Sequence, residues 1–471
     1  SIVNLLHLGR GIFGSDFGTT AFVVKNDTFL EYKASYKKLY KKQGAVDSIE
    51  NKERLFFETD ENYTASFNEF LCVPGYPIIY RINNQIENLY KDAVLLGDLV
   101  QPKQGLATGG TDKFLRGWYE VEYNKICFDA NDREQALESK KKWFPINKGG
   151  DYCKWYGNRE NIVDWENDGY EIRHNFDEKG KLKSRPQNMD YYFRESISCS
   201  AITAAIVSYR YYPAGAIFDV NFRSIFVDDR IKYKLIAILN SKIMQIFCEL
   251  LNPTMALNAY DINRFPLVFE FEGAEEVEQL AKQCIQISKE IWDEKERSFE
   301  FKSNSCLKYR KIGKLEEIFS IVVNEKQKKQ EQLIIYEKRI EQLLTKAYGF
   351  TYQEEEINVA NITKRDVVED LLSYFIGCAV GRYSIYQEGI WTHMQNLNSN
   401  ETFKPVSDGI IIFSDDEFIK NDMVSLLEQF LTEVYGVQYL EENLNSIASI
   451  LYENTNENAK KNIRKYFINE F

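Results

Sequence analysis

Aromatic, cationic and amide side chains are interleaved over residues 105–212 at a density that a folding core does not require. The segment opens with GLATGGTDKFLRGW, continues through KKWFPINKGGDYCKWYGN and ends beyond RPQNMDYYFRESIS. Flat rings can stack on bases, lysine and arginine can bind phosphates, and amides can hydrogen-bond to base edges. These residue types in this pattern indicate a surface that binds a nucleic acid.

A turn with two glycines, at residues 105–114, is the first candidate contact within this segment. Its sequence GLATGGTDKF would allow backbone amides and threonine hydroxyls to approach a phosphate closely, with cations behind them. The residues that we expect to contact DNA here are Thr108, Gly109, Thr111, Lys113 and Arg116. Taken alone, the same turn could equally be an ordinary surface turn.

A second turn, RPQN, offers two amides of the type that pairs with adenine N6 and N7. The other candidate DNA-binding residues are Lys141, Lys142, Lys148, Tyr156, Arg159, Arg185, Gln187, Asn188, Tyr191 and Arg210. The rings considered for stacking also include Trp143, Trp155, Trp165 and Tyr192. We expect half of the rings to be structural, because tryptophan is mostly buried. If the three tryptophans are all interior, the predicted contacts reduce to the cations and the amides.

Two glycine-containing motifs near the start are similar to nucleotide-binding loops. Residues 9–14 fit G-x-G-x-x-G, but the segment that follows predicts a strand, whereas a dinucleotide site needs a helix N-terminus there. The DFGTT motif at residues 16–20 resembles the first phosphate loop of actin-like ATPases, in which Asp16 would lie near Mg²⁺. No second Asp-Gly phosphate loop follows in the right place. A tight hairpin explains the motif as well, and the ATPase stays open as an alternative.

The sequence contains no motif for methyl transfer to an amine. Such an enzyme needs [D/N]-P-P-[Y/F/W], in which oxygens accept protons of the target amine while the ring stacks on the flipped base. Asn252 and Pro253 are followed by Thr254 and Met255, and no S-adenosylmethionine loop of the F-x-G-x-G type occurs. Three histidines, and eight cysteines without a C-x-x-C pair, predict neither a catalytic residue nor a metal site.

Charge is distributed unevenly along the 471 residues. The formal net charge is −12, which argues against a nonspecific DNA coat. Residues 101–215 carry 18 Lys/Arg and 17 Asp/Glu, a balance of +1, whereas residues 401–471 carry 6 and 13, a balance of −7. The acidity therefore lies outside the aromatic and basic segment, which permits a site-specific binder. The scattered cysteines and the lack of a secretion signal or a long apolar run predict a cytoplasmic protein with no membrane segment.

The apolar periodicity predicts a mixed α+β, multidomain chain. We expect two strands within residues 1–25, a strand at residues 70–82, and a helix over residues 229–251. Two amphipathic helices are expected from residue 274 and over residues 315–349, the second ending at a glycine. They indicate either a spacer or an ordinary helical subdomain. Residues 350–471 predict a mixed terminal unit with a helix at residues 367–383 and a buried strand at residues 409–413.

Several long segments resemble the PglX family, the adenine-specific DNA methyltransferases of BREX and phage-growth-limitation systems. GLATGGTDKFLRGW, KKWFPINKGGDYCKWYGN, DWENDGYEIR and RPQNMDYYFRESISCS are similar to the region after the family's catalytic domain, and LHLGRGIFGSDFGTTAFVVKN to the strands that close that domain. AILNSKIMQ followed by DINRFPLV resembles target-recognition domains of type I and type IIG restriction–modification proteins. The resemblance covers nearly the whole chain.

The resemblance implies a division of the chain into five parts. Residues 1–35 would be closing strands of the methyltransferase domain and residues 36–100 a connector. Residues 101–270 would form an α/β target-recognition domain, residues 271–348 a helical spacer, and residues 349–471 a small C-terminal α/β domain. The cofactor loop and the N-P-P-Y motif would lie upstream of Ser1, so the chain would be the C-terminal part of such an enzyme.

The function implied is recognition of a short nonpalindromic DNA site by a methyltransferase that flips an adenine and methylates N6 with S-adenosylmethionine. The whole protein would mark self DNA in a bacterial anti-phage system. Its partners would be double-stranded DNA, other components of the defence system and a phage inhibitor protein, with no membrane. This chain would bind DNA without holding the cofactor or transferring a methyl group. The alternatives are the actin-like ATPase and a protein-interaction module.

Overall fold

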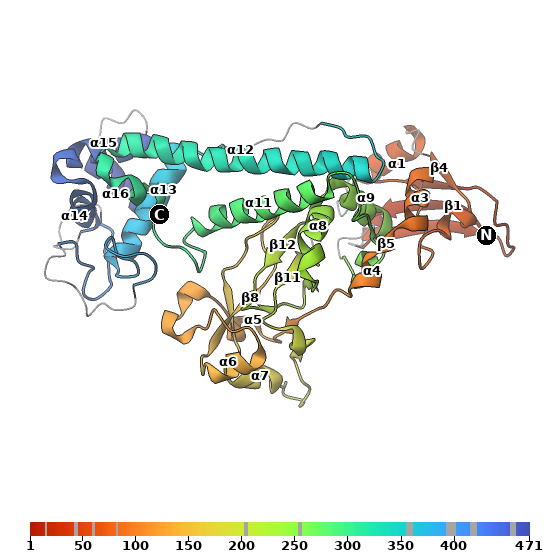
Figure 1. Ribbon diagram of the computed structural model, residues 1–471, viewed down its shortest axis with the longest axis horizontal. Helices are drawn as coiled ribbons and strands as arrows, with labels where there is room; N and C mark the ends of the chain where they lie inside the picture. The colour runs from red at the N-terminus through yellow and green to blue at the C-terminus, as the bar shows by residue number, and fades with distance from the viewer. Residues whose placement is uncertain are drawn as a thin grey trace. The chain divides into compact units, whose positions relative to one another are not determined.

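The computed structural model describes residues 1–14, 17–41, 46–58, 62–81, 83–201, 206–252, 257–354, 361–391, 402–414, 422–452 and 458–471 (Figure 1). The chain forms two compact units. The first comprises Ser1–Arg116, Ile126–Gln286 and Tyr336–Glu355; the second comprises Gly117–Lys125, Ile287–Ile335 and Glu356–Phe471. The architecture is mixed α/β, with several small sheets and many helices.

The first unit begins with a four-stranded sheet of order β2-β1-β3-β4. Its strands are β1 (Ile2–Gly9), β2 (Thr19–Val24), β3 (Ala34–Lys38) and β4 (Asn62–Ala65). The two strands predicted within residues 1–25 are confirmed, since β1 pairs with β2 in antiparallel fashion and with β3 in parallel fashion. Leu5, Tyr36 and Phe70 form the centre of a small core beneath the sheet.

Short helices and a turn connect this sheet to the rest of the unit. They are α1 (Ile49–Glu58), α2 (Phe67–Phe70), α3 (Asn84–Asp92) and α4 (Leu96–Leu99). The strand expected at residues 70–82 is wrong over its described part, because α2 ends at Phe70 and a turn follows. Gly75 adopts a φ of +81° within this turn, a left-handed conformation that glycine accommodates readily.

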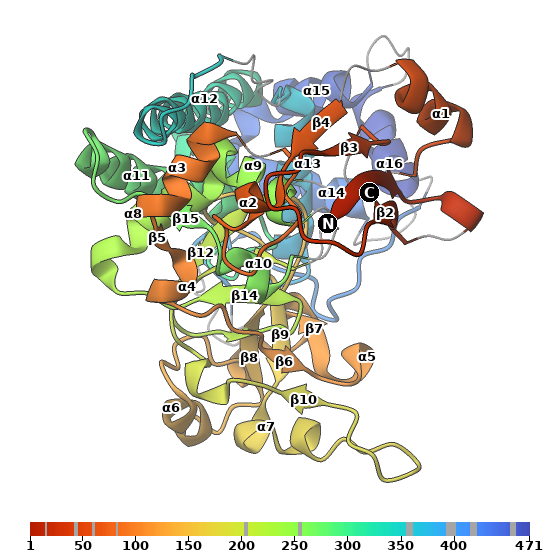
Figure 2. The ribbon, with the colours of Figure 1, turned by 90° about the vertical axis from the view of Figure 1, so that its right-hand side faces the viewer.

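Small sheets fill the middle of the first unit (Figure 2). One has the order β13-β8-β9-β7, a second β12-β11-β14, and two pairs are β10-β6 and β15-β5. The strands are β5 (Val94–Leu95), β6 (Leu106–Ala107), β7 (Leu115–Gly117), β8 (Trp143–Asn147), β9 (Asn161–Asp164), β10 (Arg185–Pro186), β11 (Ser196–Ser200), β12 (Tyr209–Tyr212), β13 (Ile217–Phe218), β14 (Phe222–Ile225) and β15 (Pro266–Leu267). The helices are α5 (Thr111–Phe114), α6 (Arg133–Glu138), α7 (Glu166–Arg173), α8 (Asp229–Asn240), α9 (Lys242–Leu251) and α10 (Ala259–Ile262).

The helix predicted over residues 229–251 is broken in two at Ser241. The serine has an extended ψ of 156°, and its hydroxyl accepts a hydrogen bond from the backbone N–H of Met244 at 3.2 Å. Serine competes with the helix for backbone partners and therefore favours an N-cap position. Apolar periodicity continues across the break, which is why it indicated one helix.

Two long helices confirm the amphipathic pattern. They are α11 (Ala274–Asp293) and α12 (Leu315–Ala347). In α11 the side chains of Val277, Ala281 and Cys284 are buried, as the spacing requires. The chain leaves α12 through Gly349, which has a φ of +74° and so serves as the expected helix stop. Among the residues that the structure describes, no helix is long and apolar enough to cross a membrane.

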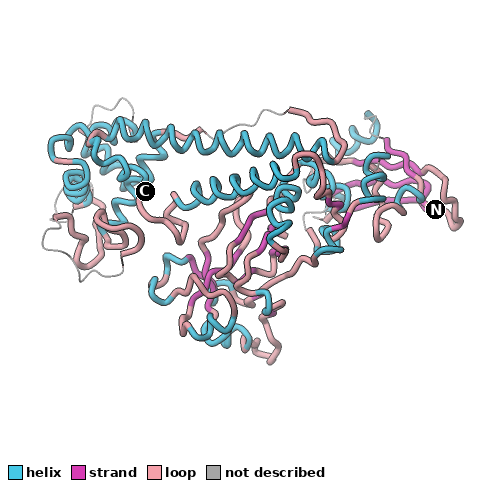
Figure 3. Tube along the Cα trace, in the orientation of Figure 1, coloured by secondary structure: helices cyan, strands magenta, loops and turns pink. Residues whose placement is uncertain are grey.

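Helices build the described part of the second unit (Figure 3). Besides the parts of α11 and α12 that belong to it, they are α13 (Lys364–Ala379), α14 (Met423–Tyr435), α15 (Leu440–Leu451) and α16 (Ala459–Asn469). The buried strand expected at residues 409–413 is wrong: Ile410 is 62% exposed, and Ile412 makes only an isolated bridge to Asp422. Leu371, Phe430 and Ile447 are fully buried at the helical core instead.

A carboxylate on α12 holds the middle of the first unit to that helix. Glu337 accepts a hydrogen bond from the indole N–H of Trp155 at 2.6 Å, and its Oε1 lies 3.9 Å from Lys154 Nζ. Burial opposes the charge on Lys154, but the charges of Glu337, Tyr152, Glu341 and Cys284 together outweigh it and hold the pKa of Lys154 above its usual range. One turn further along α12, Glu341 accepts from the backbone N–H of Lys242 at 3.0 Å, at the first turn of α9.

Replacing Glu337 with alanine should destabilise the first unit. Glu337→Ala removes the partner of a largely buried ammonium group and of a buried indole N–H, which should lower the free energy of unfolding by about 2–3 kcal/mol. Chemical denaturation followed by tryptophan fluorescence measures the change. Glu337→Gln is the matched control, because it retains an acceptor for Trp155 and should lose less. Equal stability of the alanine variant and the wild type would contradict the assigned role.

His7 lies between two tyrosines in the core of the first sheet. Its Nδ1 is 3.1 Å from the Tyr80 hydroxyl, and its ring makes an edge contact with Tyr40 at a centroid distance of 4.9 Å. Burial lowers the pKa of His7 to about 4, and the positive charges of Lys38 and Arg81 contribute to the shift. The folded chain therefore favours the neutral imidazole.

The stability of the first sheet should fall as the pH decreases from about 6.5 to about 4. Between these values the unfolded chain binds a proton at His7 that the folded chain does not, so the contribution of the neutral ring is complete above pH 6.5 and is lost on acidification. We expect a loss of roughly 1–3 kcal/mol, since the ring is partly exposed. Unfolding midpoints of wild type and His7→Gln across this pH range should converge toward pH 4. Parallel pH profiles for the two proteins would refute the assignment.

Candidate nucleic-acid interface

The two turns that the sequence singled out lie side by side. β6 and β10 pair in antiparallel register, with Ala107 opposite Arg185 and Leu106 opposite Pro186. Beyond the pair, the Asn188 amide donates to the Gln104 carbonyl at 2.8 Å, and the Gln187 amide donates to the Gly105 carbonyl at 3.5 Å. Two segments that are about 80 residues apart in the sequence therefore form one edge of the first unit.

Gly109 lies where the backbone of the first segment passes directly against the backbone of Lys183 and Ser184. Its φ is +71°, and a Cβ placed on it would lie 2.6 Å from the carbonyl carbon of Lys183 and 2.8 Å from the backbone nitrogen of Ser184. The neighbouring Thr108 is buried, and its hydroxyl accepts a hydrogen bond from the Gly110 N–H at 3.3 Å. The Thr108 hydroxyl thus shapes the turn, whereas Thr111 at the start of α5 is exposed.

Several of the predicted cations are already paired with protein groups. Lys113 lies 3.5 Å from Glu171, and Lys142 lies 3.3 Å from Asp164. Arg116 donates to the carbonyl of Asp112 at 2.6 Å and stacks 5.9 Å from the Trp143 ring centroid. Lys141 and Lys148 are half-buried. Exposed ion pairs are weak, so Lys113 can exchange its partner for a phosphate at small cost.

Besides Thr108, three of the predicted contacts lie in the interior. Arg210 is 1% exposed and lies between the rings of Tyr212 and Phe222, at 5.9 and 5.7 Å from their centroids. Arg159 donates to the Tyr156 hydroxyl and lies over the Tyr156 ring, and both side chains are buried. In the described conformation none of the three can touch a phosphate or a base.

The rings give the same result. Trp143, Trp155, Trp165 and Tyr192 are all buried, so the condition under which the contacts reduce to cations and amides is met. Tyr191 is half-buried, with Lys103 and Arg194 each 5.3 Å from its ring centroid. The tryptophans predicted to stack on bases therefore belong to the core, and Tyr191 with its two cations is the predicted stacking ring that is partly exposed.

Four cations follow one another at this edge. Arg185 was among the predicted DNA contacts, and the other three were not. Lys179, Lys181 and Lys183 precede Arg185, and all four side chains are exposed. No carboxylate of the described residues lies within 4.0 Å of any of them. The sequence contains these cations as K-x-K-x-K-x-R. Lys181 and Lys183 alternate along one strand and so share a face, whereas Lys179 precedes Gly180 in the turn.

The residues near the start do not fit a dinucleotide or S-adenosylmethionine. Residues 9–14 lead from β1 into a short 3-10 turn at Ile12–Gly14, and the chain continues into β2 rather than into a helix whose N-terminus could bind a phosphate or carboxylate. Asp16 of the DFGTT motif and Pro253, Thr254 and Met255 lie outside the described residues. Within the described chain, no group of three or more His, Cys, Asp or Glu side chains could hold a metal ion.

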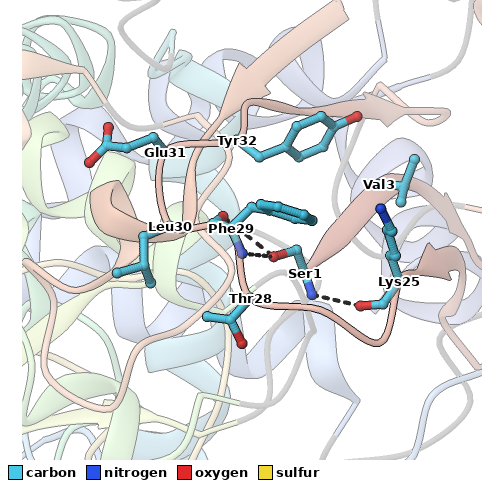
Figure 4. Close-up of a pocket in the computed structure, with 8 residues that line it drawn as sticks. All are labelled: Ser1, Val3, Lys25, Thr28, Phe29, Leu30, Glu31 and Tyr32. Atoms are coloured by element: carbon cyan, nitrogen blue, oxygen red, sulfur yellow. Dashed lines mark hydrogen bonds between the residues drawn. The ribbon is translucent and has the colours of Figure 1, made fainter.

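An open hollow of about 940 Å³ lies beside β1 (Figure 4). Its lining residues are Ser1, Val3, Lys25, Thr28, Phe29, Leu30, Glu31 and Tyr32. The Ser1 hydroxyl accepts from the Phe29 N–H at 2.7 Å, and the Ser1 backbone nitrogen donates to the Lys25 carbonyl at 2.9 Å. These contacts join the start of β1 to the loop after β2, and they provide no nucleophile with an adjacent base.

Substituting Gly109 should disturb the interface, whereas substituting its neighbour should not. Gly109→Ala combines a left-handed backbone with a Cβ inside van der Waals distance of the Lys183 and Ser184 backbone, and should cost about 2–3 kcal/mol of stability. Gly110→Ala is the matched control, because its Cβ would meet side-chain atoms no closer than 3.8 Å. Thermal unfolding and amide hydrogen exchange at residues 105–111 check both. Equal effects of the two substitutions would show that the close approach is unimportant.

No protein-family model matches the chain. The chain is 31% identical over 501 aligned residues to the adenine-specific methyltransferase PglX of Lacticaseibacillus casei (strain Zhang), with 100% of this chain and 41% of the relative covered. It is also 31% identical over 516 residues to the adenine-specific methyltransferase BrxX of Escherichia coli O9:H4 (strain HS), covering 40% of that relative. The chain thus spans about two fifths of the length of these curated relatives.

Among solved structures, the type IIL restriction–modification enzyme MmeI in complex with DNA aligns with 79% of this chain and 45% of its own. The sequence identity is 9% and the TM-score is 0.37, which does not establish a common fold. The sequence matches to PglX and BrxX extend over the whole chain at an identity well above that level. By sequence, the chain is therefore similar over its whole length to about two fifths of PglX and BrxX, both adenine-specific methyltransferases.

Proposed function

We propose that this chain is the DNA-recognition part of a site-specific adenine-N6 DNA methyltransferase that uses S-adenosylmethionine and acts in a bacterial anti-phage system. The observation that carries the proposal is the set of exposed cations at residues 179–185, which pair with no carboxylate of the described residues, next to the backbone turn at residues 105–111. Because the net charge of the chain is −12, these cations attract phosphates locally, and the protein surface as a whole does not. Double-stranded DNA is the proposed partner.

The proposed contacts fall into two groups. Contacts to the phosphates of the DNA backbone come from the side chains of Lys113, Lys183 and Arg185 and from the backbone amides near Thr111. These groups are exposed on one edge of the first unit. Base contacts come from Gln187 and Asn188, whose amide nitrogens are held by the Gly105 and Gln104 carbonyls. That anchoring would orient their side chains before DNA binds, which lowers the entropy lost on binding.

Residues 101–270 would serve as the target-recognition domain, and α11 and α12 as the spacer that sets its position. β1 and β2 would close the sheet of the catalytic domain of the whole protein. Phe22, Val23 and Val24 of the edge strand β2 are more than half exposed, and such an apolar edge is typically covered by a neighbouring part of the protein. Residues 349–471 would form the C-terminal domain, and other components of the defence system would be further partners.

Salt dependence of duplex binding tests the proposal. A random-sequence 40-base-pair duplex should bind the 471-residue chain with an affinity that falls steeply with salt, and Lys183→Ala/Arg185→Ala should reduce the slope of log K against log salt by about 1.8, for two lost phosphate contacts. Fluorescence anisotropy across a salt series measures the slope.

The matched control removes two cations from the same unit that are already paired. Lys91 lies 3.2 Å from Glu87, and Lys346 lies 2.7 Å from Glu272, so Lys91→Ala/Lys346→Ala changes the net charge equally and should leave the slope unchanged. Absence of salt-dependent duplex binding by the wild-type chain would refute the proposed function. It would instead favour a protein-interaction module, whose affinity should depend little on salt.

A further inference from the structure

A β-hairpin at residues 175–183 projects from the first unit between α7 and β10 (Figure 2). The Lys183 N–H donates to the Asn175 carbonyl, and the Asp177 N–H donates to the Lys181 carbonyl, each at 2.8 Å. Gly180 at the tip has a φ of +76°, and the Asp177 carboxylate accepts from the backbone N–H groups of Lys179 and Lys181. The hairpin therefore holds its own shape through local bonds.

The two faces of this hairpin differ in chemistry. Because side chains alternate along a strand, Asn175, Asp177, Lys181 and Lys183 share one face, and Phe176 and Leu182 form a cross-strand pair on the other. Phe176 is 53% exposed and Leu182 is 41% exposed. An exposed phenylalanine–leucine pair at the end of a projecting hairpin contributes little to folding.

The apolar face continues toward α7 through two more rings. The His174 ring stacks on Tyr170 at a centroid distance of 4.1 Å and makes an edge contact with Phe176 at 6.5 Å. Tyr170 is itself 55% exposed. The hairpin thus presents an apolar ridge that is supported from behind by a stacked pair of rings.

Charge next to this ridge indicates which partner would cover it. Lys179, Lys181, Lys183 and Arg185 follow one another at alternate positions with no acidic residue among them, and no described carboxylate pairs with them. A protein surface would have to supply four carboxylates to match this set. The phosphates along a groove of duplex DNA provide such a row of charges at regular spacing.

We propose that this hairpin enters a groove of duplex DNA and places Phe176 and Leu182 against the bases as an apolar wedge, with its cations on the flanking phosphates. The inference rests on the proposed function and extends it by naming the two side chains that would contact the bases. A two-stranded ribbon is narrow enough to enter a groove, and apolar side chains inserted at a base step unstack and kink the duplex. The deformation depends on the sequence of the step, so the wedge contributes to site preference without a hydrogen bond to any base.

The test begins with a selected probe. The wild-type chain is used to enrich binders from 40-base-pair duplexes with 20 random central positions, and the enriched pool is labelled at both ends for energy transfer. Phe176→Ala/Leu182→Ala should bind the enriched pool about tenfold more weakly and lose the energy-transfer change that reports bending. It should bind the unselected pool as the wild type does, with the same salt slope, because no cation is removed.

Two control variants separate the wedge from general effects. Phe57→Ala/Leu71→Ala removes an exposed phenylalanine and an exposed leucine elsewhere in the first unit and should leave both pools unaffected. Phe176→Leu/Leu182→Met keeps the ridge apolar and should retain most of the affinity. The thermal midpoint of every variant should equal that of the wild type, because the replaced side chains are exposed.

The inference and the proposed function fail by different results. Wild-type affinity and bending in Phe176→Ala/Leu182→Ala would overturn the wedge, while salt-dependent binding by the wild type would leave the proposed function intact. A loss of affinity in Phe176→Leu/Leu182→Met as large as that in the alanine pair would also overturn it. No salt-dependent binding by the wild type would remove the proposed function itself.

Discussion

Attachment of the middle of the first unit to α12 depends on a partly buried acid, Glu337, and on Glu341 one turn further along the helix. Glu337 binds the indole N–H of Trp155 and faces Lys154, although 182 residues separate it from Trp155. Without that carboxylate, an ammonium group and an indole would remain buried without compensation, which is among the more costly defects in a protein interior. The small sheets of this unit are individually too short to be stable alone, so their order depends on such long-range contacts.

The paired and unpaired cations of the first unit have separate roles. Arg210 and Arg159 are covered by rings and fill the interior, and Lys142 and Lys113 face carboxylates. The cations of residues 179–185 have no such partners among the described residues, and they lie at the edge formed by β6 and β10. A nearly neutral segment can thus still carry a positive surface, because several of its acids, such as Asp164, Asp168 and Glu171, pair with other cations.

Local patterns in the sequence predicted the helices and strands better than they predicted which side chains are exposed. The helices α11 and α12 and the β1–β2 hairpin follow directly from periodicity and glycine placement. The break at Ser241 was missed because a single hydroxyl that caps a helix does not interrupt apolar spacing. Burial of Arg210 was not predicted. An arginine that packs between aromatic rings in a core and an arginine that binds DNA beside exposed rings have the same local sequence pattern. The pairing of β6 with β10 is non-local, and nothing within either turn encodes its partner.

The self-contained turn at the tip of the projecting hairpin has an evolutionary consequence. Asp177 and Gly180 fix the turn with bonds that stay within the hairpin, and Gly180 has no atom near its would-be side chain. Residues on either side of that turn can therefore be exchanged without disturbing the packing of the domain beneath. A recognition protein built in this way can acquire a new preference through a few surface substitutions, while the scaffold that holds the hairpin stays the same.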